Sequence, residues 1–419
     1  MKLLWITFAP VGKANELFYG RKTQSGGWVD ATAAALQPYI KKDQVSLCIT
    51  CMGDKDLCET DEETAIAYRM VNIRPVRGKR GERSDLEKWQ NLIRETDPDL
   101  IQIWGTEFSF GLDVLDAAGR IPVCFYIQGA MGSVAAHPLG DIPAGKLARQ
   151  LGLFSWPKLL QQKKAHKIND LQVAIEAEMV KRSAGILADN LWSQAQYGVS
   201  DDRFFPVSLA MNPCFMEAAW TAQNCQKHTL FTVAGGACPS KGVHNAVLAV
   251  AKLKEKYPDI RLHIPGYISR RKPNFWYDSL YIRQIEKLIG QYGLQENVIF
   301  VGSLTPQQMA EHMRRANVFV MPSCVETHSS TLREAMAAGT PCVSAMVGSV
   351  PEFLQHGKNG YLYRYDEAET LAFYIDRLFS DEALAAQLGA AGRETVRQMF
   401  PQEKIGQQLM DAYCAMINK

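Results

Sequence analysis

The stretch NVFVMPSCVETHSSTLREAMAAGTPCVSA, residues 317–345, decides the fold class of this chain. It begins with an apolar run that ends in Pro-Ser, passes through hydroxyl residues into a helix-forming segment, and returns to a second apolar run. Ser329 and Ser330 are favoured helix N-cap residues, and Gly339 followed by Pro341 is typical of a helix end. A strand, a helix and a strand in this order predict a parallel α/β layer.

The same alternation extends along the whole chain. The first half contains the apolar runs LLWITF, QVSLCIT, DLIQIW, PVCFYI and GILAD, and the second half contains LFTVAG, IRLHIPG, NVIFVG, NVFVMPS and PCVSA. Helical spacing lies between the runs of the second half, near residues 243–256, 280–292, 305–316 and 330–338. The predicted fold class is therefore α/β, with two doubly wound, Rossmann-like domains.

The domain boundary is expected at PVSLAMNPCF, residues 206–215, where Asn and Pro break the periodicity. We assign 1–205 to an N-terminal domain with an insertion at about 129–169, and 206–400 to a C-terminal domain. A last helix in 401–419 is expected to cross back to the first domain. Ligands of open parallel sheets bind beyond the carboxyl ends of the strands, so the two domains are expected to face a central cleft.

The composition of the chain indicates which partners it binds and where in the cell it is located. The 419 residues are 47% hydrophobic with a net charge of +2, which gives no reason to expect a nucleic-acid partner. The first ten residues, MKLLWITFAP, predict a strand rather than a secretory leader, and no apolar run has the length of a membrane span, so we expect a cytoplasmic protein. The ten cysteines are expected to be reduced, although the CxxC formed by Cys48 and Cys51 leaves a redox role open.

One basic segment interrupts the alternation. Residues 146–167, KLARQLGLFSWPKLLQQKKAHK, interleave aromatic and aliphatic side chains with lysines and an arginine. Such a segment can lie on an anionic membrane surface, which predicts peripheral contact with the inner face of the cytoplasmic membrane. The alternative is a solvated helical insertion that covers the first domain.

Two glutamates flank the hydroxyl residues of the opening stretch. The helix that starts near Ser330 presents free backbone amides to the carboxyl edge of the sheet, which favours a bound phosphate. Carboxylates repel phosphate, so Glu326 and Glu334 are expected to hold sugar or ribose hydroxyls instead. Together these groups suit a nucleotide sugar. The alternative is that Glu334 only interacts with the helix dipole and Glu326 only with solvent.

The residues 318–363 resemble the signature of the retaining glycosyltransferases of family four. The shared pattern is a strand, Pro-Ser, a glutamate, seven residues, a second glutamate, AMA, Gly-x-Pro, and a later glycine before Pro-Glu. The resemblance continues through VIFVGSLTPQQMAEHMRRANVF and, more weakly, through the first half. It implies the GT-B fold, in which two Rossmann-like domains face a cleft and a C-terminal helix returns to the first domain.

The resemblance also implies roles for individual residues. Glu326 would contact the transferred sugar, Glu334 the ribose hydroxyls, and Lys241, in VAGGACPSKGVHNAV, would clamp the diphosphate where the leaving group becomes negative. The implied catalytic residues are Glu326, Lys241 and Gln128. The implied donor-binding residues are Glu334, Gly26, Gly27, Gly235, Gly236, Gly266, Arg270, Ser303, His328, Ser329, Ser330 and Thr331.

This chain departs from the family pattern at three places. Thr327, His328 and Ser329 stand where the family has Gly-Phe-Gly, which puts the donor sugar in doubt, and Gly236 stands in place of an arginine that Arg270 or Arg271 could replace. Gln128 stands where the family has a histidine; it can hydrogen-bond a sugar hydroxyl but cannot take up a proton. A retaining transfer on one face of the sugar needs no protein base, because the leaving phosphate can accept the acceptor's proton.

The residues WGTE follow the third strand of the first domain, and we expect Trp104 and Glu107, with Gln128, to contact the acceptor. The predicted function is retaining transfer of a sugar from a nucleotide donor, a UDP-sugar rather than a GDP-sugar, to a saccharide or lipid-linked saccharide in cell-surface polysaccharide or glycoconjugate synthesis. No cofactor and no metal are expected, since no DxD follows a strand. The alternatives are a nonenzymatic nucleotide-sugar-binding protein and another GT-B enzyme, an epimerase or a phosphorylase.

Overall fold

The computed structural model describes residues 1–20, 27–137, 139–143, 145, 156–232, 238–266 and 280–419. Within these ranges, residues 156–166 and 280 are described by their backbone alone. The chain divides into two compact units. Unit 1 comprises Met1–Ala135, His166–Met211 and Pro401–Lys419, and unit 2 comprises Ala136–Ala165 and Asn212–Phe400.

These units differ from the predicted domains in two respects. The chain passes into unit 2 between Met211 and Asn212 rather than after residue 205. The residues 136–165, which we predicted as part of an insertion in the first domain, group with unit 2. The last residues, Pro401–Lys419, group with unit 1, so that unit is built from three separate pieces of sequence.

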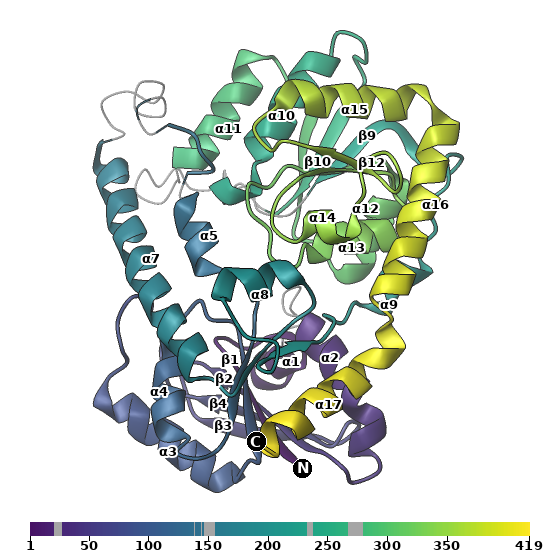
Figure 1. The fold of residues 1–419 in the computed structure, drawn as a ribbon. Helices are drawn as coiled ribbons and strands as arrows, with labels where there is room; N and C mark the ends of the chain where they lie inside the picture. The colour runs from purple at the N-terminus through teal and green to yellow at the C-terminus, as the bar shows by residue number, and fades with distance from the viewer. Residues whose placement is uncertain (21–26, 138, 144, 146–155, 233–237, 267–279) are drawn as a thin grey trace. The chain divides into compact units, whose positions relative to one another are not determined.

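Unit 1 contains an eight-stranded sheet of order β3-β4-β2-β1-β5-β6-β7-β8, drawn in Figure 1. All neighbours are parallel except β3, which pairs antiparallel with β4. The strands are β1 (Lys2–Thr7), β2 (Ser46–Met52), β3 (Leu57–Asp61), β4 (Ile66–Val71), β5 (Leu100–Trp104), β6 (Val123–Tyr126), β7 (Gly185–Ala188) and β8 (Phe204–Pro206).

Helices cover both faces of this sheet. One apolar cluster joins α1, α2 and α17 to one face, and another joins α3, α4 and α7 to the other. The short helices α5 and α8 lie at the strand ends. The bounds are α1 (Gly12–Tyr19), α2 (Gly27–Ile40), α3 (Arg83–Thr96), α4 (Phe110–Ala117), α5 (Met131–Ala136), α7 (Trp156–Arg182), α8 (Leu191–Tyr197), η3 (Gln402–Lys404) and α17 (Ile405–Ile417).

Unit 2 contains a six-stranded, wholly parallel sheet of order β11-β10-β9-β12-β13-β14. Both faces are covered by helices, which explains why its strands read as continuous apolar runs rather than as alternating ones. The strands are β9 (Gln226–Thr232), β10 (Arg261–Pro265), β11 (Val298–Gly302), β12 (Ala316–Met321), β13 (Cys342–Ala345) and β14 (Tyr361–Tyr363).

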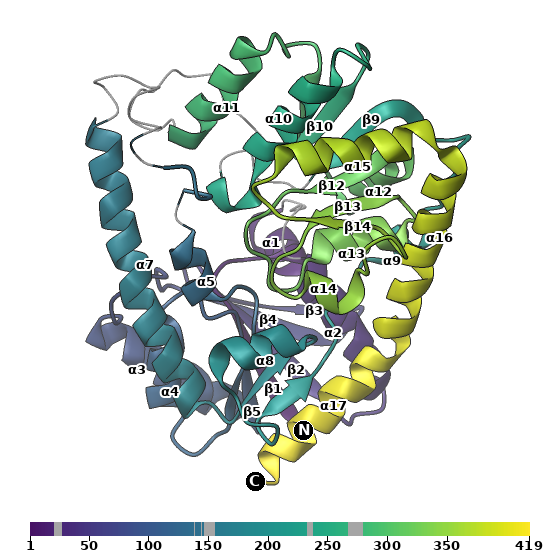
Figure 2. The same cartoon turned by 45° about the horizontal axis from the view of Figure 1, so that its top comes forward.

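In unit 2, α10, α11 and α15 pack on one face of the sheet, and α12 and α13 pack on the other, as Figure 2 shows. The bounds are α9 (Pro213–Glu217), η2 (Pro239–Lys241), α10 (Val243–Leu253), α11 (Leu280–Gln291), α12 (Pro306–Arg315), α13 (Ser330–Ala337), α14 (Val350–Phe353), α15 (Ala368–Ser380) and α16 (Glu382–Met399). Within the described part of the chain, no helix combines the length and the apolar composition that crossing a bilayer requires.

Candidate functional site

The strand order of unit 2 places its binding edge between β9 and β12. The chain runs outward from β9 through β10 to β11, and then returns to β12 on the opposite side of β9. In a parallel sheet, the loops that follow two such strands separate at a switch point and leave a crevice for a ligand. Lys241 follows β9 and Glu326 follows β12, so the two predicted residues lie on the two loops that border this point.

Lys241 and Glu326 form an ion pair. The Lys241 Nζ atom donates to Glu326 Oε1 at 2.7 Å, and the two side chains are 33% and 9% exposed. Burial lowers the pKa of Lys241, but the facing Glu326 carboxylate raises it by more, so the pKa lies above its ordinary value. The ammonium group is therefore charged at neutral pH, at the edge where an anion would bind.

Close backbone contacts hold the two loops together. Gly242 has φ 64°, and a Cβ atom there would lie 1.8 Å from the Pro322 carbonyl oxygen. The Cys324 amide donates to the Ser240 carbonyl at 2.9 Å. Since glycine alone fits the first contact, the Lys-Gly pair of the sequence fixes where the Lys241 side chain starts.

A second glycine holds the backbone of Glu326. Gly348 has φ 52°, and a Cβ atom at this position would lie 1.6 Å from the Glu326 carbonyl oxygen. The glycine that precedes Pro-Glu in the sequence motif thus packs directly on the first glutamate of that motif.

Unpaired hydroxyl groups line the connection from β12 to α13. Ser323 and Ser329 are buried, and among the described residues their hydroxyl oxygens have no hydrogen-bond partner. Ser329 is the N-cap residue of α13, but its side chain makes no capping bond. Thr327 and His328 are buried beside it. Buried hydroxyls are normally satisfied, so these two mark a place where a polar ligand would supply the missing bonds.

Glu334 lies half-buried on α13. Its carboxylate has no hydrogen-bond partner within the part of the chain that the structure describes, and burial raises its pKa to about 8, against the smaller opposing effect of Arg333. A carboxyl group without such a partner can exchange hydrogen bonds with ligand hydroxyls, and at neutral pH its mostly protonated form can both donate and accept them.

The other predicted donor residues are spread more widely. Gly266 follows β10 and donates its amide to Gly302 at 2.8 Å, while the exposed Ser303 follows β11, two strands away from β9. Ser330 and Thr331 form the first turn of α13. Gly235, Gly236, Arg270 and Gly26 lie outside the described residues. Gly27 is the first residue of α2, and a Cβ atom there would meet open space, so packing within the protein does not require a glycine at 27.

The corresponding switch point of unit 1 lies between β1 and β5, and Glu107 follows β5. Gly105 has φ 88°, and a Cβ atom there would lie 2.0 Å from Glu107 Oε2. Burial, and then the neighbouring Glu176 carboxylate, raise the pKa of Glu107 to about 7, while Arg77 lowers it. Glu107 therefore exists in both protonation states near neutral pH and can donate or accept a hydrogen bond.

Gln128 and Trp104 differ in what they offer a ligand. Gln128 follows β6, and its Nε2 atom is buried without a hydrogen-bond partner among the described residues. Trp104 is only 3% exposed and packs in the core, 5.2 Å from Trp5 and 4.8 Å from Tyr126 between ring centroids. The expectation that Trp104 contacts the acceptor needs correction, because a ring in the core has no free surface for a ligand.

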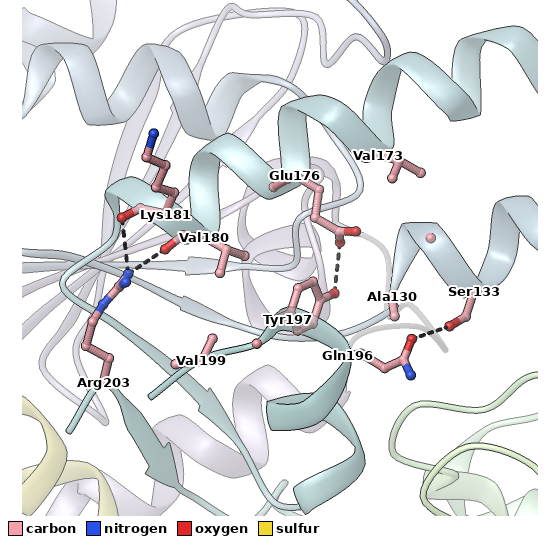
Figure 3. A pocket seen from close by; sticks show the side chains of 13 residues that line it. Ala130, Ser133, Val173, Glu176, Val180, Lys181, Gln196, Tyr197, Val199 and Arg203 are labelled. Carbon is pink, nitrogen blue, oxygen red and sulfur yellow. Dashed lines mark hydrogen bonds between the residues drawn. The ribbon is translucent and has the colours of Figure 1, made fainter. Parts of the chain in front are cut away.

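A pocket of about 350 Å³ lies in unit 1 between α5, α7 and α8, and Figure 3 shows its side chains. The buried Glu176 accepts hydrogen bonds from Tyr197 at 2.9 Å, from the Met131 amide at 3.1 Å, and from the Thr106 hydroxyl. These bonds satisfy the carboxylate. Glu176 therefore has a structural role at the strand ends and is not a candidate ligand-binding residue.

Sequence reasoning missed Glu176. The available signal was Gln172, four residues earlier on the same helical face, whose buried side chain accepts a hydrogen bond from the Ser109 hydroxyl at 2.8 Å. A pair of polar residues on the inward face of a helix indicates a buried polar network.

Among the described residues, the cysteines and acidic side chains give no support for a redox site or a metal site. All ten cysteines are free thiols, and burial raises the pKa of Cys51 to about 12, which opposes a redox role for the CxxC. Over the described ranges, no group of three or more His, Cys, Asp or Glu side chains is arranged to hold a metal ion.

The second half of the chain matches a known family. Residues 222–395 match the model of the glycosyl transferases group 1 family. A curated relative, N-acetyl-alpha-D-glucosaminyl L-malate synthase of Bacillus anthracis, is 33% identical over 129 residues, which are 31% of this chain and 33% of the relative. The matches to the next curated relatives cover 45% of their length, so the chain aligns with a third to a half of these proteins.

Solved structures resemble the whole chain. Sucrose-phosphate synthase of Thermosynechococcus elongatus has a TM-score of 0.72 at 18% identity, over 99% of this chain and 98% of that one. The protein HepE of Anabaena, solved in complex with UDP and glucose, has a TM-score of 0.68 at 16% identity and covers 98% of both chains. At these identities the likeness establishes the fold. Residues 222–395 therefore match the glycosyl transferases group 1 family, on a chain that has the GT-B fold.

Proposed function

We propose that this chain is a retaining glycosyltransferase that moves a sugar from a nucleotide donor to a hydroxyl of a saccharide or lipid-linked saccharide, in cell-surface polysaccharide or glycoconjugate synthesis. The observation that carries the proposal is the ion pair of Lys241 with Glu326, 2.7 Å long, at the switch point of the unit 2 sheet and just before the N-terminus of α13.

Each group has a distinct chemical task in this proposal. Lys241 supplies a positive charge to the diphosphate leaving group as it becomes more negative in the transition state, and the first amides of α13 add hydrogen bonds to it. Glu326 accepts from hydroxyls of the transferred sugar, and Glu334 from the ribose. When the diphosphate binds, Lys241 exchanges part of its contact with Glu326 for the phosphate oxygens.

The donor is proposed to be a UDP-sugar. The similarity to HepE, which was solved with UDP and glucose, supports this choice. No metal is proposed, because Lys241 and helix amides can neutralise a diphosphate without one. Gln128 can orient a sugar hydroxyl but cannot act as a base, so the leaving phosphate is proposed to accept the acceptor's proton.

Glu107 is proposed to contact the acceptor. It follows β5 at the switch point of the unit 1 sheet, and its pKa of about 7 lets it accept from or donate to an acceptor hydroxyl at neutral pH. Glu107 is proposed to bind the acceptor and not to act as a base, because the leaving phosphate accepts the proton of the acceptor hydroxyl.

A direct test compares donor binding and turnover in Lys241→Ala and Glu334→Gln, using UDP-, GDP- and ADP-sugars. Removing the clamp is expected to lower turnover about 100-fold, the typical effect of losing one donor to the transition-state charge. Lys256→Ala is the matched control, because Lys256 also forms an ion pair in unit 2, at 2.6 Å with Asp376. Unchanged turnover in both test variants would contradict the residue assignments.

The same assays separate the alternatives. Tight binding of the donor with no turnover, so that not even slow release of free nucleotide is detected, would indicate a binding protein. Epimer formation without an acceptor, or a requirement for inorganic phosphate, would indicate an epimerase or a phosphorylase.

A cytoplasmic location with peripheral membrane contact through residues 146–167 is also proposed from the sequence. Residues 146–155 of this segment, and the side chains of 156–166, lie outside what the structure describes. Flotation with phosphatidylglycerol vesicles tests it. Equal recovery with neutral phosphatidylcholine vesicles would argue against the contact.

A further inference from the structure

The residues 139–142 pack against the short turn that carries Lys241. They follow α5, and they belong to unit 2 together with η2 and the β12 loop. A tight turn shapes them, because the Gly140 amide donates to His137 O at 3.1 Å and the Ile142 amide donates to Leu139 O at 3.2 Å. Ile142 packs on the apolar core of unit 2. The segment is thus anchored in the unit that contains the proposed donor site.

Gly140 packs closely on the Lys241 turn. It has φ 58°, and a Cβ atom there would lie 2.2 Å from the carbonyl oxygen of Pro239. That oxygen also accepts the Gly242 amide at 3.0 Å, which closes the turn around Lys241. Gly140 therefore covers the carbonyl on which the turn is built, and any larger residue would push the turn away.

Asp141 fastens the segment to the next loop. Its Oδ2 atom accepts from the Tyr365 hydroxyl and lies 2.7 Å from His137 Nδ1. The Tyr365 carbonyl accepts from Asn245 Nδ2 at 2.7 Å, and the Asn245 amide donates to Gly242 O at 2.8 Å. The contacts form a closed path from Asp141 through Tyr365 and Asn245 back to the Lys241 turn.

The Lys241 turn is consequently held from two sides. The Pro322 carbonyl and the Cys324 amide contact it from the β12 loop, and Gly140 contacts it from the segment 139–142. Within the described residues, the side-chain bonds that attach this segment to Tyr365 come from Asp141.

We propose that Gly140 and Asp141 are positioning residues for Lys241, and that they hold its turn where the ammonium group reaches the diphosphate of the donor. This inference rests on the proposed function, in which Lys241 binds that diphosphate. In this inference neither residue needs to contact the donor. They act through the Pro239 carbonyl and through Tyr365, so their loss selectively weakens recognition of the distal phosphate.

The experiment measures the affinities of UDP, GDP and ADP and of their monophosphates by calorimetry in Gly140→Ala, Asp141→Ala, Asp141→Asn and Lys241→Ala. We expect Gly140→Ala and Asp141→Ala to weaken the best-binding diphosphate about ten-fold and its monophosphate less than about two-fold, the scale of one lost charge-assisted bond. Asp141→Asn keeps an oxygen acceptor for Tyr365 and should recover most of the affinity.

Two matched controls separate positioning from general destabilisation. Gly357→Ala places a side chain at φ 74° with nothing within 4 Å, so it reproduces the backbone strain without the contact. Asp259→Ala removes another unit 2 carboxylate paired with a histidine, at 2.8 Å from His228, ahead of β10 at the opposite edge of the sheet. Both controls should keep the diphosphate-to-monophosphate ratio of the unmodified protein.

The outcomes distinguish the inference from the proposed function. If Lys241→Ala lowers diphosphate affinity while Gly140→Ala and Asp141→Ala do not, the positioning role is wrong and the proposed function stands. If Lys241→Ala has no effect, or if the unmodified protein binds none of the three diphosphates, the proposed function fails and the inference fails with it. Equal loss of monophosphate and diphosphate in the Asp141 variants would also overturn the positioning role, and Asp141→Ala decides the matter if Gly140→Ala does not fold.

Discussion

Ser329 adopts a backbone conformation that its side chain disfavours. Its φ of 51° lies in the left-handed region, where a residue with a Cβ atom loses about 1–2 kcal/mol relative to the right-handed one. It caps α13 without a side-chain hydrogen bond, so among the described residues no hydrogen bond of its hydroxyl group offsets this strain. A strained hydroxyl residue at a binding edge is consistent with a role toward a ligand.

The strain predicts the effect of Ser329→Gly. Glycine adopts this φ without strain, which stabilises the folded state, but it also increases the conformational entropy of the unfolded chain, which lowers stability. On balance, the variant should be as stable as the unmodified protein or more stable by up to about 1 kcal/mol. Thermal unfolding measures this. Nucleotide affinity should fall if the Ser329 hydroxyl binds the donor, and a variant that is clearly less stable would contradict the strain.

Gly348→Ala should have the opposite effect. A methyl group 1.6 Å from the Glu326 carbonyl oxygen cannot be accommodated, so the Glu326 loop must move. We expect a loss of about 2 kcal/mol or more in stability and a large loss of donor affinity. Denaturant unfolding and calorimetry check these effects, and Gly119→Ala, at φ 62° with nothing within 4 Å, serves as the control for strain. Equal behaviour of the two variants would refute the contact.

Single residues differ in how far the sequence reveals them. Lys241 and Glu326 stand next to strand ends in recognisable patterns, and the structure joins them at 2.7 Å. Asp141 could not be found in this way, because its partner Tyr365 is 224 residues away and no periodicity connects the two. Trp104 was expected to contact the acceptor but lies in the core. The sequence could not distinguish the two, because residues at the end of a buried strand can either pack in the core or contact a ligand.

At the scale of elements, α17 is the helix that completes unit 1. Its buried Tyr413 accepts a hydrogen bond from Trp5 Nε1 at 3.1 Å and donates to Gln102 Oε1 at 2.6 Å. Trp5 belongs to β1 and Gln102 to β5, so one hydroxyl of the C-terminal helix ties together two central strands.

Tyr413→Phe should therefore destabilise unit 1. The change leaves the Trp5 N–H and the Gln102 oxygen buried without a partner, which costs about 1–3 kcal/mol. Tyr39→Phe is the matched control: Tyr39 also bonds α17, through Gln407 Oε1 at 2.9 Å, but at an exposed site where water replaces the hydroxyl. Chemical denaturation measures both, and similar losses in the two variants would argue against the buried network.

The elements that were predicted are those with strong local signals. The buried parallel strands and the helices between them follow the apolar runs and the spacing of the sequence. Four strands were missed. Three of them lie at sheet edges: β3 is mostly exposed and antiparallel, and β8 and β14 have three residues each. The fourth, β4, lies inside the sheet, but its polar and half-exposed positions interrupt the apolar run. Edge strands carry no continuous apolar run, so tertiary pairing rather than sequence pattern defines them.

At the scale of the whole molecule, two half-buried carboxyl groups predict how stability depends on pH. Burial raises the pKa of Glu107 to about 7 and that of Glu334 to about 8, against an ordinary value of 4.5 in the unfolded chain. Over that interval the folded state binds more protons than the unfolded state, so the free energy of unfolding falls as pH rises. His263, whose pKa burial lowers to about 4, acts in the opposite direction only below about pH 6.5.

We therefore expect stability to fall between pH 6.5 and pH 8 by an amount on the order of 1 kcal/mol per group. The double variant Glu107→Gln with Glu334→Gln should lose most of this dependence, which melting temperatures at the two pH values would reveal. Glu311→Gln is the control, since bonding to Arg314 lowers the pKa of Glu311 and keeps it ionised throughout this range. A pH dependence that persists in the double variant would contradict the assignment.

Trp5 and Tyr413 are bonded although 408 residues of chain separate them. During translation, the β1 side of unit 1 must therefore stay uncovered while Asn212–Phe400 emerges from the ribosome and folds. The nascent chain exposes this aromatic surface until α17 (Ile405–Ile417) is made, so unit 1 is the half that depends on chaperones to prevent aggregation before α17 packs.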